Sequence, residues 1–285
     1  MRGFNARLPE LWRLMANKGR RSQTRSALPI NIRVRASHRS LELTAAPISL
    51  VSLFKMEPKR PRHLSEYARV SLEAVASAGL GGTMSLGGAI GLLHYLDYRD
   101  THDVDAWWSS TAGEEDRERV LRVIEKALEP YGELRRRAWG DVVSIDLRRE
   151  GKTVFNFQVA SRSAQLEPTL EAPWVAIALD SLQDLLASKM VALVERGAPR
   201  DFRDIHAACG AGLATPAECW SMWRRRQELA ESDADSHRAR LAVESHLERI
   251  ARHRPLDDIR DSTKRVEAEN LREWFRKEFM SALRD

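Results

Sequence analysis

Residues 84–108 of this chain read MSLGGAIGLLHYLDYRDTHDVDAWW, a pattern that predicts a short strand, a Gly-Gly turn, a short helix and a second strand. Asp103 and Asp105 are separated by one residue in the second strand, and alternate residues of a strand share a face. Both carboxylates can therefore reach one divalent cation, while the residue between them points into the core. Gly87 and Gly88 precede the helix, and residues without a Cβ let backbone N–H groups approach a phosphate closely. The stretch predicts a nucleotide held over a metal ion.

Each part of this pattern also has a simpler explanation. Two aspartates at i and i+2 occur at solvated strand ends, and a Gly-Gly pair before an apolar helix also permits close helix packing. His102, next to the first aspartate, either contacts phosphate or is an ordinary loop residue. The combination of features, rather than any single one, carries the prediction of a nucleotide site.

The order and spacing of these residues resemble those of the nucleotidyltransferase toxins of the abortive-infection AbiEii type, a branch of the polymerase-β-like nucleotidyltransferase superfamily. The pattern of that family is a hydrophobic strand, Gly-Gly or Gly-Ser, a short apolar helix, an Arg, a Ser or Thr, and then Asp-hydrophobic-Asp. The matching positions in this sequence are Gly87, Gly88, Arg99, Thr101, Asp103 and Asp105. The resemblance implies that the two aspartates hold Mg²⁺ or Mn²⁺ and that the other four residues contact the nucleotide.

A second stretch, residues 184–205, is similar to the other signature of the same family, and its sequence is DLLASKMVALVERGAPRDFRDI. The matching positions are Lys189, Ala192, Leu193, Arg196, Arg200, Asp201 and Asp204. The resemblance implies an α+β fold in which a polymerase-β-like nucleotidyltransferase core with a mixed sheet is followed by a helical C-terminal part.

Lys189 belongs to a predicted helix that begins after Asp180 or Ser181 and has apolar residues at helical spacing. A Lys beside an apolar stripe usually extends to solvent, which is one interpretation of this residue. The family resemblance favours the other, in which the ammonium binds the triphosphate of an NTP as a mobile point charge.

Pro199 begins another predicted helix, and Asp201 and Asp204 share one face of its first turns. Acidic residues there can be ordinary helix caps, because the positive end of the helix dipole stabilises them. The resemblance implies instead that Arg200, Asp201 and Asp204 close and shape the nucleotide pocket.

The chain departs from the family at a later strand, where a third carboxylate commonly helps to bind metal and accepts a proton. The sequence has Gln158 at the candidate position, with Asn156 two residues earlier, and neither amide can act as a base. Asp146, in the preceding strand, either substitutes for the missing carboxylate or faces solvent at the edge of the sheet. The metal is then held by two carboxylates and the phosphates of the nucleotide, or the activity is altered.

The charge of the chain is concentrated at its N-terminus. The whole chain carries a net charge of +5, but residues 1–55 contain eleven Lys and Arg and two Glu, and the remaining residues carry more acidic than basic groups. This segment has no sustained hydrophobic period and is either a nucleic-acid-binding arm, a targeting segment, or upstream sequence translated ahead of a start at Met56. No stretch of the chain reaches the ~18 consecutive apolar residues of a membrane span.

The cysteine content indicates a reducing compartment, and we expect a cytoplasmic protein. Cys209 and Cys219 are too few for a structural zinc site or a disulfide framework. His206 lies three residues before the first cysteine, an arrangement more typical of packing than of metal binding. Trp220 and Trp223 stand beside three arginines at positions 224–226, a cluster that either binds RNA or contributes core tryptophans and solvated arginines.

We expect three segments, namely a basic extension at 1–55, a nucleotidyltransferase core at 56–179 and a helical domain at 180–285. Helices are predicted over 64–78 and 114–131 and from the capping box at 215–218 onward, and strands over 134–139, 142–147, 153–160 and 174–179.

The predicted function is transfer of a nucleoside monophosphate from an NTP to an acceptor hydroxyl, with the metal neutralising charge on the transferred group. The resemblance implies an RNA acceptor, such as the acceptor end of tRNA, and a toxin restrained by a cognate antitoxin protein. Two alternatives remain open: a catalytically degenerate nucleotide- or RNA-binding module, and a nucleotidyltransferase that modifies a protein or a small molecule.

Overall fold

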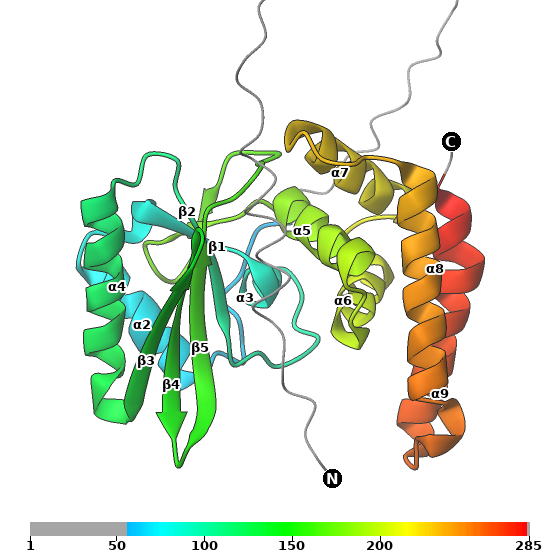
Figure 1. Ribbon diagram of the computed structural model, residues 1–285, viewed down its shortest axis with the longest axis horizontal. Helices are drawn as coiled ribbons and strands as arrows, with labels where there is room; N and C mark the ends of the chain where they lie inside the picture. The colour runs from blue at the N-terminus through cyan, green and yellow to red at the C-terminus, as the bar shows by residue number, and fades with distance from the viewer. Residues whose placement is uncertain (1–55, 284–285) are drawn as a thin grey trace, which may run out of the picture.

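A computed structural model of the chain describes residues 56–283, so the interpretations of residues 1–55 lie outside the described residues. Within this range the centre of the molecule is a sheet of seven strands in the order β3-β4-β5-β2-β1-β7-β6 (Figure 1). The strands are β1 (Met84–Leu86), β2 (Val104–Trp108), β3 (Glu133–Trp139), β4 (Val142–Arg149), β5 (Lys152–Ala160), β6 (Leu170–Glu171) and β7 (Ala178–Leu179).

The sheet contains both parallel and antiparallel pairs. β1 is antiparallel to β2 and parallel to β7, whereas β5 is parallel to β2 and antiparallel to β4. Strands β3, β4 and β5 form an antiparallel meander whose turns use residues of positive φ, including Gly140 and Gly151. The predicted α+β class, with a mixed sheet and a helical C-terminal part, is confirmed.

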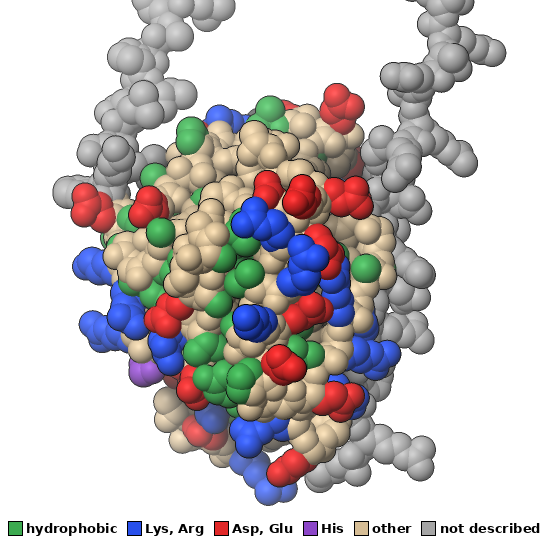
Figure 2. Space-filling model, turned by 90° about the vertical axis from the view of Figure 1, so that its left-hand side faces the viewer, with side chains coloured by type: hydrophobic (Ala, Val, Ile, Leu, Met, Phe, Trp, Pro, Cys, Tyr) green, Lys and Arg blue, Asp and Glu red, His purple; other side chains and the backbone are tan. Residues whose placement is uncertain are grey.

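Two helices, α2 (Glu66–Ser77) and α4 (Glu114–Leu128), cover one face of the sheet (Figure 1). Both are amphipathic, and α4 buries Val120, Leu121 and Ile124 on its inner side. Successive strand residues alternate between faces, so the apolar side chains of β5, such as Phe157, fill the layer between this face and the helices. On the outer side of α4, basic and acidic side chains are interspersed (Figure 2).

The opposite face carries the short helix α3 (Gly88–Leu92) and the helices that follow the sheet in sequence. These are α5 (Leu182–Glu195), α6 (Pro199–Gly210), α7 (Pro216–Leu229), α8 (Ser236–His253) and α9 (Ser262–Trp274), with a final π-helical turn at Phe275–Phe279. The predicted capping box at Thr215 and Glu218 is present at the start of α7. The hydroxyl of Ser181 accepts from the amide of Asp184 and thereby caps α5.

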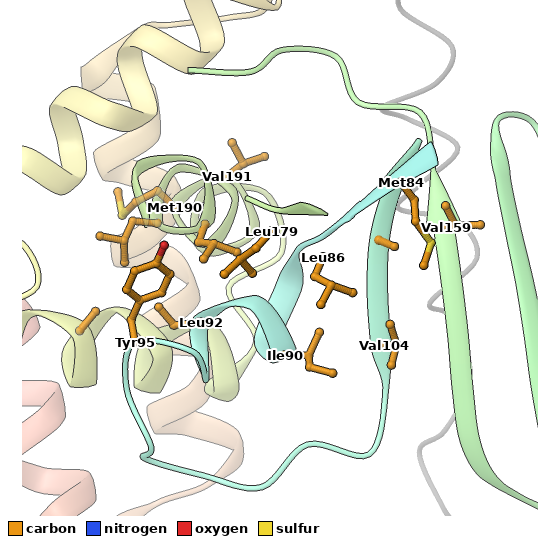
Figure 3. Packing of buried hydrophobic residues seen from close by; sticks show 14 of the residues in the cluster. Met84, Leu86, Ile90, Leu92, Tyr95, Val104, Val159, Leu179, Met190 and Val191 are labelled. Atoms are coloured by element: carbon orange, nitrogen blue, oxygen red, sulfur yellow. The ribbon is translucent and has the colours of Figure 1, made fainter. Parts of the chain in front are cut away.

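One apolar cluster joins the sheet to the C-terminal helices. Leu86 and Leu179 of the sheet, Ile90 and Leu92 of α3, and Met190 of α5 belong to it (Figure 3). Farther out, rings of α6, α7 and the final turn pack against one another, with the Phe202 and Phe275 centroids 4.7 Å apart. The position of the helices over the site therefore depends on the same core as the sheet.

Some element boundaries differ from those predicted. The strand expected over 174–179 shrinks to Ala178–Leu179, because residues 172–177 form a turn in which the amide of Ala172 donates to the carbonyl of Ile177. The two-residue strand β6, which pairs with β7, has no signal in the sequence. Within residues 56–283, no helix has both the length and the apolar composition needed to cross a membrane.

Two adjacent glycines before β1 allow a test of this packing. A Cβ on Gly81 would lie 1.8 Å from the carbonyl oxygen of Ala176, whereas a Cβ on Gly82 would meet nothing within 4 Å. We expect Gly81→Ala to lower the free energy of unfolding by about 3 kcal/mol, because a backbone atom must move to relieve the clash. Gly82→Ala serves as the matched control and should stay within about 0.5 kcal/mol of the wild type. Chemical denaturation measures both, and equal effects would contradict the proposed contact.

Candidate active site

A pocket of about 560 Å³ lies between the sheet and helices α5, α7 and α8. On the sheet side it is lined by the predicted site residues Gly88, Arg99, Thr101, Asp103 and Asp105. On the helical side it is lined by Lys189 and Arg200. Gly87, Asp201 and Asp204 are not part of its lining but contact residues that are. Residues from both halves of the described chain therefore form one cavity, and its volume is typical of small-molecule sites.

Asp103 and Asp105 are placed as the alternation predicts. Asp105 lies in β2, Asp103 immediately precedes it, and the intervening Val104 is fully buried in the core. Loss of surrounding water raises the pKa of Asp103, and the like charge of Asp105 raises it further, while Arg200 and His102 act in the opposite direction. Neither aspartate forms an ion pair with a described residue. The two carboxylates are therefore not ion-paired, although the charges of Arg200 and Arg196 act on them without direct contact.

Close contacts with residues of β2 leave room only for glycine at positions 87 and 88. Gly88 has a φ of +56°, and a Cβ at this position would lie 2.1 Å from Oδ2 of Asp105. The amide of Gly87 donates to the backbone carbonyl of Asp105 at 2.9 Å, and a Cβ on Gly87 would lie 2.4 Å from the indole nitrogen of Trp107. The two glycines thus seat the carboxylate of Asp105, and their contact with a phosphate stays a prediction.

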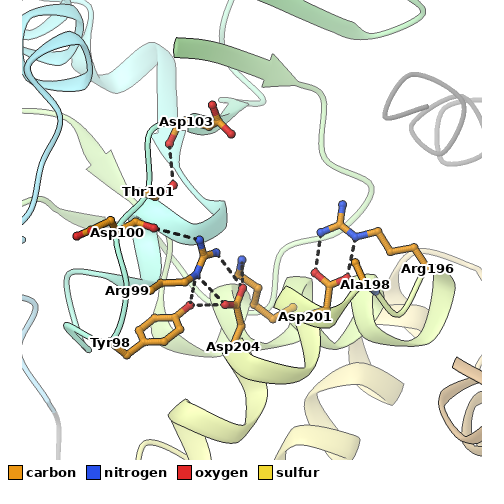
Figure 4. A network of polar contacts seen from close by, with 10 residues as sticks. Tyr98, Arg99, Asp100, Thr101, Asp103, Arg196, Ala198, Asp201 and Asp204 are labelled. Carbon is orange, nitrogen blue, oxygen red and sulfur yellow. Dashed lines mark hydrogen bonds and ion pairs between the residues drawn. The ribbon is translucent and has the colours of Figure 1, made fainter. Parts of the chain in front are cut away.

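Asp204 is the centre of a buried polar network (Figure 4). Its carboxylate is fully buried, lies 2.6 Å from the ammonium of Lys189 and accepts two hydrogen bonds from the guanidinium of Arg99, at 3.0 and 3.3 Å. The hydroxyl of Tyr98 donates to the same carboxylate at 2.6 Å. The network joins the loop after α3 to helices α5 and α6.

This network corrects one interpretation of Lys189. A Lys that extends to solvent is exposed at its tip, but the Lys189 side chain is only 10% exposed and its ammonium is paired. Asp204 is likewise not a helix cap, because its carboxylate bonds across to other elements. Burial raises the pKa of Asp204, but the charges of Lys189 and Arg99 outweigh this effect and leave the pKa below its usual value.

Asp201 is a helix cap and also pairs with a residue of the pocket lining, while its role at a nucleotide stays a prediction. Its carboxylate accepts from the amide of Ala198 at 2.9 Å and so caps α6. It also accepts two hydrogen bonds from the guanidinium of Arg196, at 2.8 and 2.7 Å (Figure 4). Because Arg196 lines the pocket, Asp201 orients a cation there without contacting the cavity itself.

At the sheet positions considered in the sequence, the structure places no third carboxylate in the pocket, although Glu195, Asp233 and Asp235 of the helical side also line it. Asp146 is buried rather than solvent-facing, because Arg137 pairs with it at 2.6 Å and the side-chain amide of Asn156 donates to it at 2.6 Å. It lies on β4, two strands away from β2, and does not line the pocket. Gln158 stands opposite Asp105 in the β2–β5 register. Within residues 56–283, no group of three or more His, Cys, Asp or Glu could hold a metal ion.

A buried charge cluster beside the pocket was missed in the sequence. Asp180 accepts from the hydroxyl of Ser85 at 2.7 Å and pairs with Arg162, whose guanidinium lies over the ring of Trp107. Burial raises the pKa of Asp180, while Arg162 and Ser85 lower it. The only available signal was the polar Asp-Ser pair before α5, which also reads as a helix cap.

The same cluster continues through Asp184 and Arg226. Asp184 accepts from the amides of Leu166 and Glu167, at 2.8 and 3.0 Å, and so anchors the loop after β5 to α5. Nη1 of Arg226 lies 3.7 Å from Asp184, and Arg226 lines the pocket. The predicted solvation of the three arginines at 224–226 is therefore wrong for Arg226, which is buried.

The tryptophans of α7 belong to the core. Trp220 and Trp223 are 3% and 2% exposed, so they are not a surface on which RNA bases can stack. The packing interpretation of His206 is also confirmed, because its ring contacts that of Trp274 with centroids 5.0 Å apart. The thiols of Cys209 and Cys219 are free, and their sulfur atoms lie 3.7 Å apart.

No family model and no curated protein matches the sequence. Among solved structures the chain is similar to an antigenic nucleotidyltransferase-like protein from Paracoccidioides brasiliensis, with 17% sequence identity and a TM-score of 0.36. The match covers 74% of this chain and 95% of that chain. A TM-score of this size does not assign the chain to a family, and its function has to be inferred from the pocket.

Asp204→Asn tests the buried network. The change leaves Lys189 and Arg99 without their counter-charge, so we expect a loss of about 3 kcal/mol in the free energy of unfolding at pH 7. The lowered pKa of Asp204 means that its contribution is present above the usual Asp pKa of about 4 and is lost as the pH falls through the folded-state value. Urea unfolding at a series of pH values should therefore show the difference between variant and wild type shrinking in acid.

The matched control for this test is Glu73→Gln, which removes the exposed pair with Arg69. Surface pairs of this kind contribute little, so the control should change stability by less than about 0.5 kcal/mol. If Asp204→Asn had the same free energy of unfolding as the wild type, the stability of the buried network would not depend on Asp204.

Proposed function

We propose that this chain is a metal-dependent nucleotidyltransferase that moves a nucleoside monophosphate from an NTP to an acceptor hydroxyl. The observation that carries the proposal is the contrast between two groups of carboxylates. Five buried aspartates of the fold are each paired with an Arg or Lys, namely Asp146, Asp180, Asp184, Asp201 and Asp204. Asp103, which is exposed, and Asp105, which is half-buried, share one face, line the pocket and have no such ion pair in the described chain. A site of this kind favours a cation.

The donor set fits Mg²⁺ or Mn²⁺ bound together with a nucleotide. These ions prefer oxygen ligands and are commonly held by one or two carboxylates plus substrate phosphates. When bound, the ion supplies positive charge that stabilises the developing charge on the transferred phosphoryl group. Asp103 and Asp105 are the residues that would hold it, and two carboxylates leave coordination positions for phosphate oxygens.

Cations that line the pocket are suited to the triphosphate. Lys189 and Arg99 share the single carboxylate of Asp204, so this group carries a net charge of +1. Arg200 adds a second cation, which is exposed, forms no ion pair in the described chain and acts on Asp103 through its charge. The negative triphosphate would lie beside these cations, with Lys189 and Arg99 contacting it and Asp204 positioning them.

The proposed reaction forms a bond between the acceptor oxygen and the α-phosphorus and breaks the bond to the α–β bridging oxygen. Pyrophosphate leaves, and the acceptor proton passes to solvent, because Gln158, the residue in register with Asp105, cannot act as a base. Phosphoryl transfer depends mainly on positioning and on electrostatic stabilisation. We therefore propose that the missing base slows the reaction without abolishing it.

Two parts of the proposal are more specific, namely the relationship to polymerase-β-like enzymes and the biological role as a toxin. Both rest on the two sequence signatures that resemble AbiEii-type toxins, which favour an RNA acceptor, such as the end of tRNA, and a cognate antitoxin. A second candidate function, a degenerate nucleotide- or RNA-binding module, is favoured by Gln158 in register with Asp105. A protein or small-molecule acceptor is the third candidate.

Label transfer separates these candidates. The full chain is incubated with each labelled NTP, Mg²⁺ and total RNA, and the products are resolved on a gel. We expect label in an RNA band, and its loss in Asp103→Asn/Asp105→Asn because two metal ligands are removed. Asp100→Asn, an exposed aspartate of the same loop outside the pocket lining, is the control and should retain transfer. NTP binding without transfer would favour the binding module, and a labelled protein band the third candidate.

Metal binding can be measured apart from activity. We expect Mg²⁺ or Mn²⁺ to raise the melting temperature of the wild type progressively with concentration, because a ligand of the folded state stabilises it by mass action. Without metal, Asp103→Asn should be slightly more stable than wild type, because it removes like-charge repulsion from Asp105. The double variant should show no metal-dependent shift. A shift of equal size in wild type and double variant would argue against the metal site.

A further inference from the structure

The helical wall of the pocket contains hydrogen-bond donors that lack partners. Arg226 is 7% exposed, lines the pocket and forms no hydrogen bond with a described residue. Its ion-pair contact with Asp184, at 3.7 Å, is too long for a hydrogen bond. Burial lowers the pKa of this guanidinium, although Asp184 acts in the opposite direction. A buried guanidinium in this situation is incompletely satisfied.

Two further polar atoms without partners belong to residues of the same wall. Nε1 of Trp223 and Oγ of Ser188 are buried and have no hydrogen-bond partner, and both residues line the pocket. Trp223 and Arg226 are three residues apart on α7 and share a helix face, and α5, which carries Ser188, packs against α7. We call Ser188, Trp223 and Arg226 the donor recess. A buried donor without an acceptor is unfavourable, so a ligand that supplies acceptors is favoured there.

The charges around the recess indicate which acceptor it takes. Arg226 and Arg162 are close to Asp184 and Asp180, so the buried charges of this region balance. A balanced cluster gives no net attraction for a second phosphate, and its unused N–H groups are satisfied by neutral carbonyl oxygens. Small aliphatic side chains from α5 and α8 also line the cavity, namely Val191, Ala192, Ala239 and Ala242. Such walls suit the flat face of a heterocyclic ring.

We propose that the donor recess binds the base of the NTP and selects bases that carry a carbonyl oxygen. Guanine, cytosine and uracil have such an oxygen, whereas adenine has none. A site built to donate to a carbonyl rejects the analogue that lacks it, because its buried donors are then left unpaired. The inference rests on the proposed function, since it places the triphosphate over Asp103 and Asp105 in the same cavity. The donor recess therefore makes ATP the poorest substrate of the four NTPs.

Equilibrium binding of the four NTPs to the full chain, measured by calorimetry, tests this inference. We expect ATP to bind at least roughly tenfold more weakly than the preferred NTP, which corresponds to the loss of one good hydrogen bond. Arg226→Lys keeps the charge but loses the planar fork of donors, so it should weaken the preferred NTP by roughly tenfold and change ATP little. The GTP, CTP and UTP titrations identify which carbonyl-bearing base fits.

Matched controls on α7 separate base recognition from damage to the helix. Arg225→Lys alters the adjacent arginine, which pairs with Glu167 at the surface, and should leave the preference unchanged. Trp223→Phe removes the unpartnered N–H and should reduce the preference, whereas Trp220→Phe removes an N–H that donates to the carbonyl of Phe279 and should not. Ser188→Ala makes the smallest change to packing and tests the recess even if Trp223→Phe does not fold.

The outcomes distinguish this inference from the proposed function. If ATP binds as well as the other NTPs, or if Arg226→Lys and Ser188→Ala keep the wild-type preference, the recess does not read the base. Metal-dependent transfer that is lost in Asp103→Asn/Asp105→Asn would still support the nucleotidyltransferase in that case. If no NTP binds to the wild-type chain with Mg²⁺, both the proposed function and the inference fail.

Discussion

The arrangement of the site depends on the buried carboxylate of Asp204. It accepts hydrogen bonds from Tyr98 and Arg99 of the loop before β2, and it pairs with Lys189 of α5 from its own position on α6. A carboxylate buried in this way is stable only while its partners stay in place, because desolvation of a lone charge costs several kcal/mol. The loop that leads to Asp103 and the helix that carries Lys189 are therefore held in one geometry by a single side chain.

The aspartates near this network fall into two groups, those that are paired with an Arg or Lys and those that have no such partner. Most of the buried aspartates are matched with arginine or lysine, and these pairs orient the helices and the loop after β5. Asp103 and Asp105, which line the pocket, have no ion pair with a described residue, and their mutual repulsion is tolerated by the fold. This contrast with the paired aspartates supports the proposed metal site.

The sheet contributes to the site through its register. Asp105 and Gln158 share the face of the sheet that lines the pocket with the apolar Trp107 and Ala160, whereas Val104 and Phe157 on the other face are buried in the core, so the same alternation builds the core and the floor of the pocket. Gln158 lies beside Asp105 for this reason, and Asp146 is one strand farther away, neutralised by Arg137. The proposed chemistry consequently uses the two carboxylates of Asp103 and Asp105 together with cations of the pocket lining.

The sequence by itself determined the features that depend on neighbouring residues. The spacing of Asp103 and Asp105 implied a shared face, the Thr215 capping box predicted the start of α7, and hydrophobic periodicity predicted α2 and α4. The pairing of Lys189 with Asp204, the burial of Asp146 and Arg226, and the cluster at Asp180 were decided by the tertiary structure. A charged residue carries no local sign of its partner, because the partner is brought close only when distant segments pack together. The environment of Lys189 therefore depends on α6 and on the loop that carries Arg99. The hydrophobic periodicity of α5 contains no information about either segment.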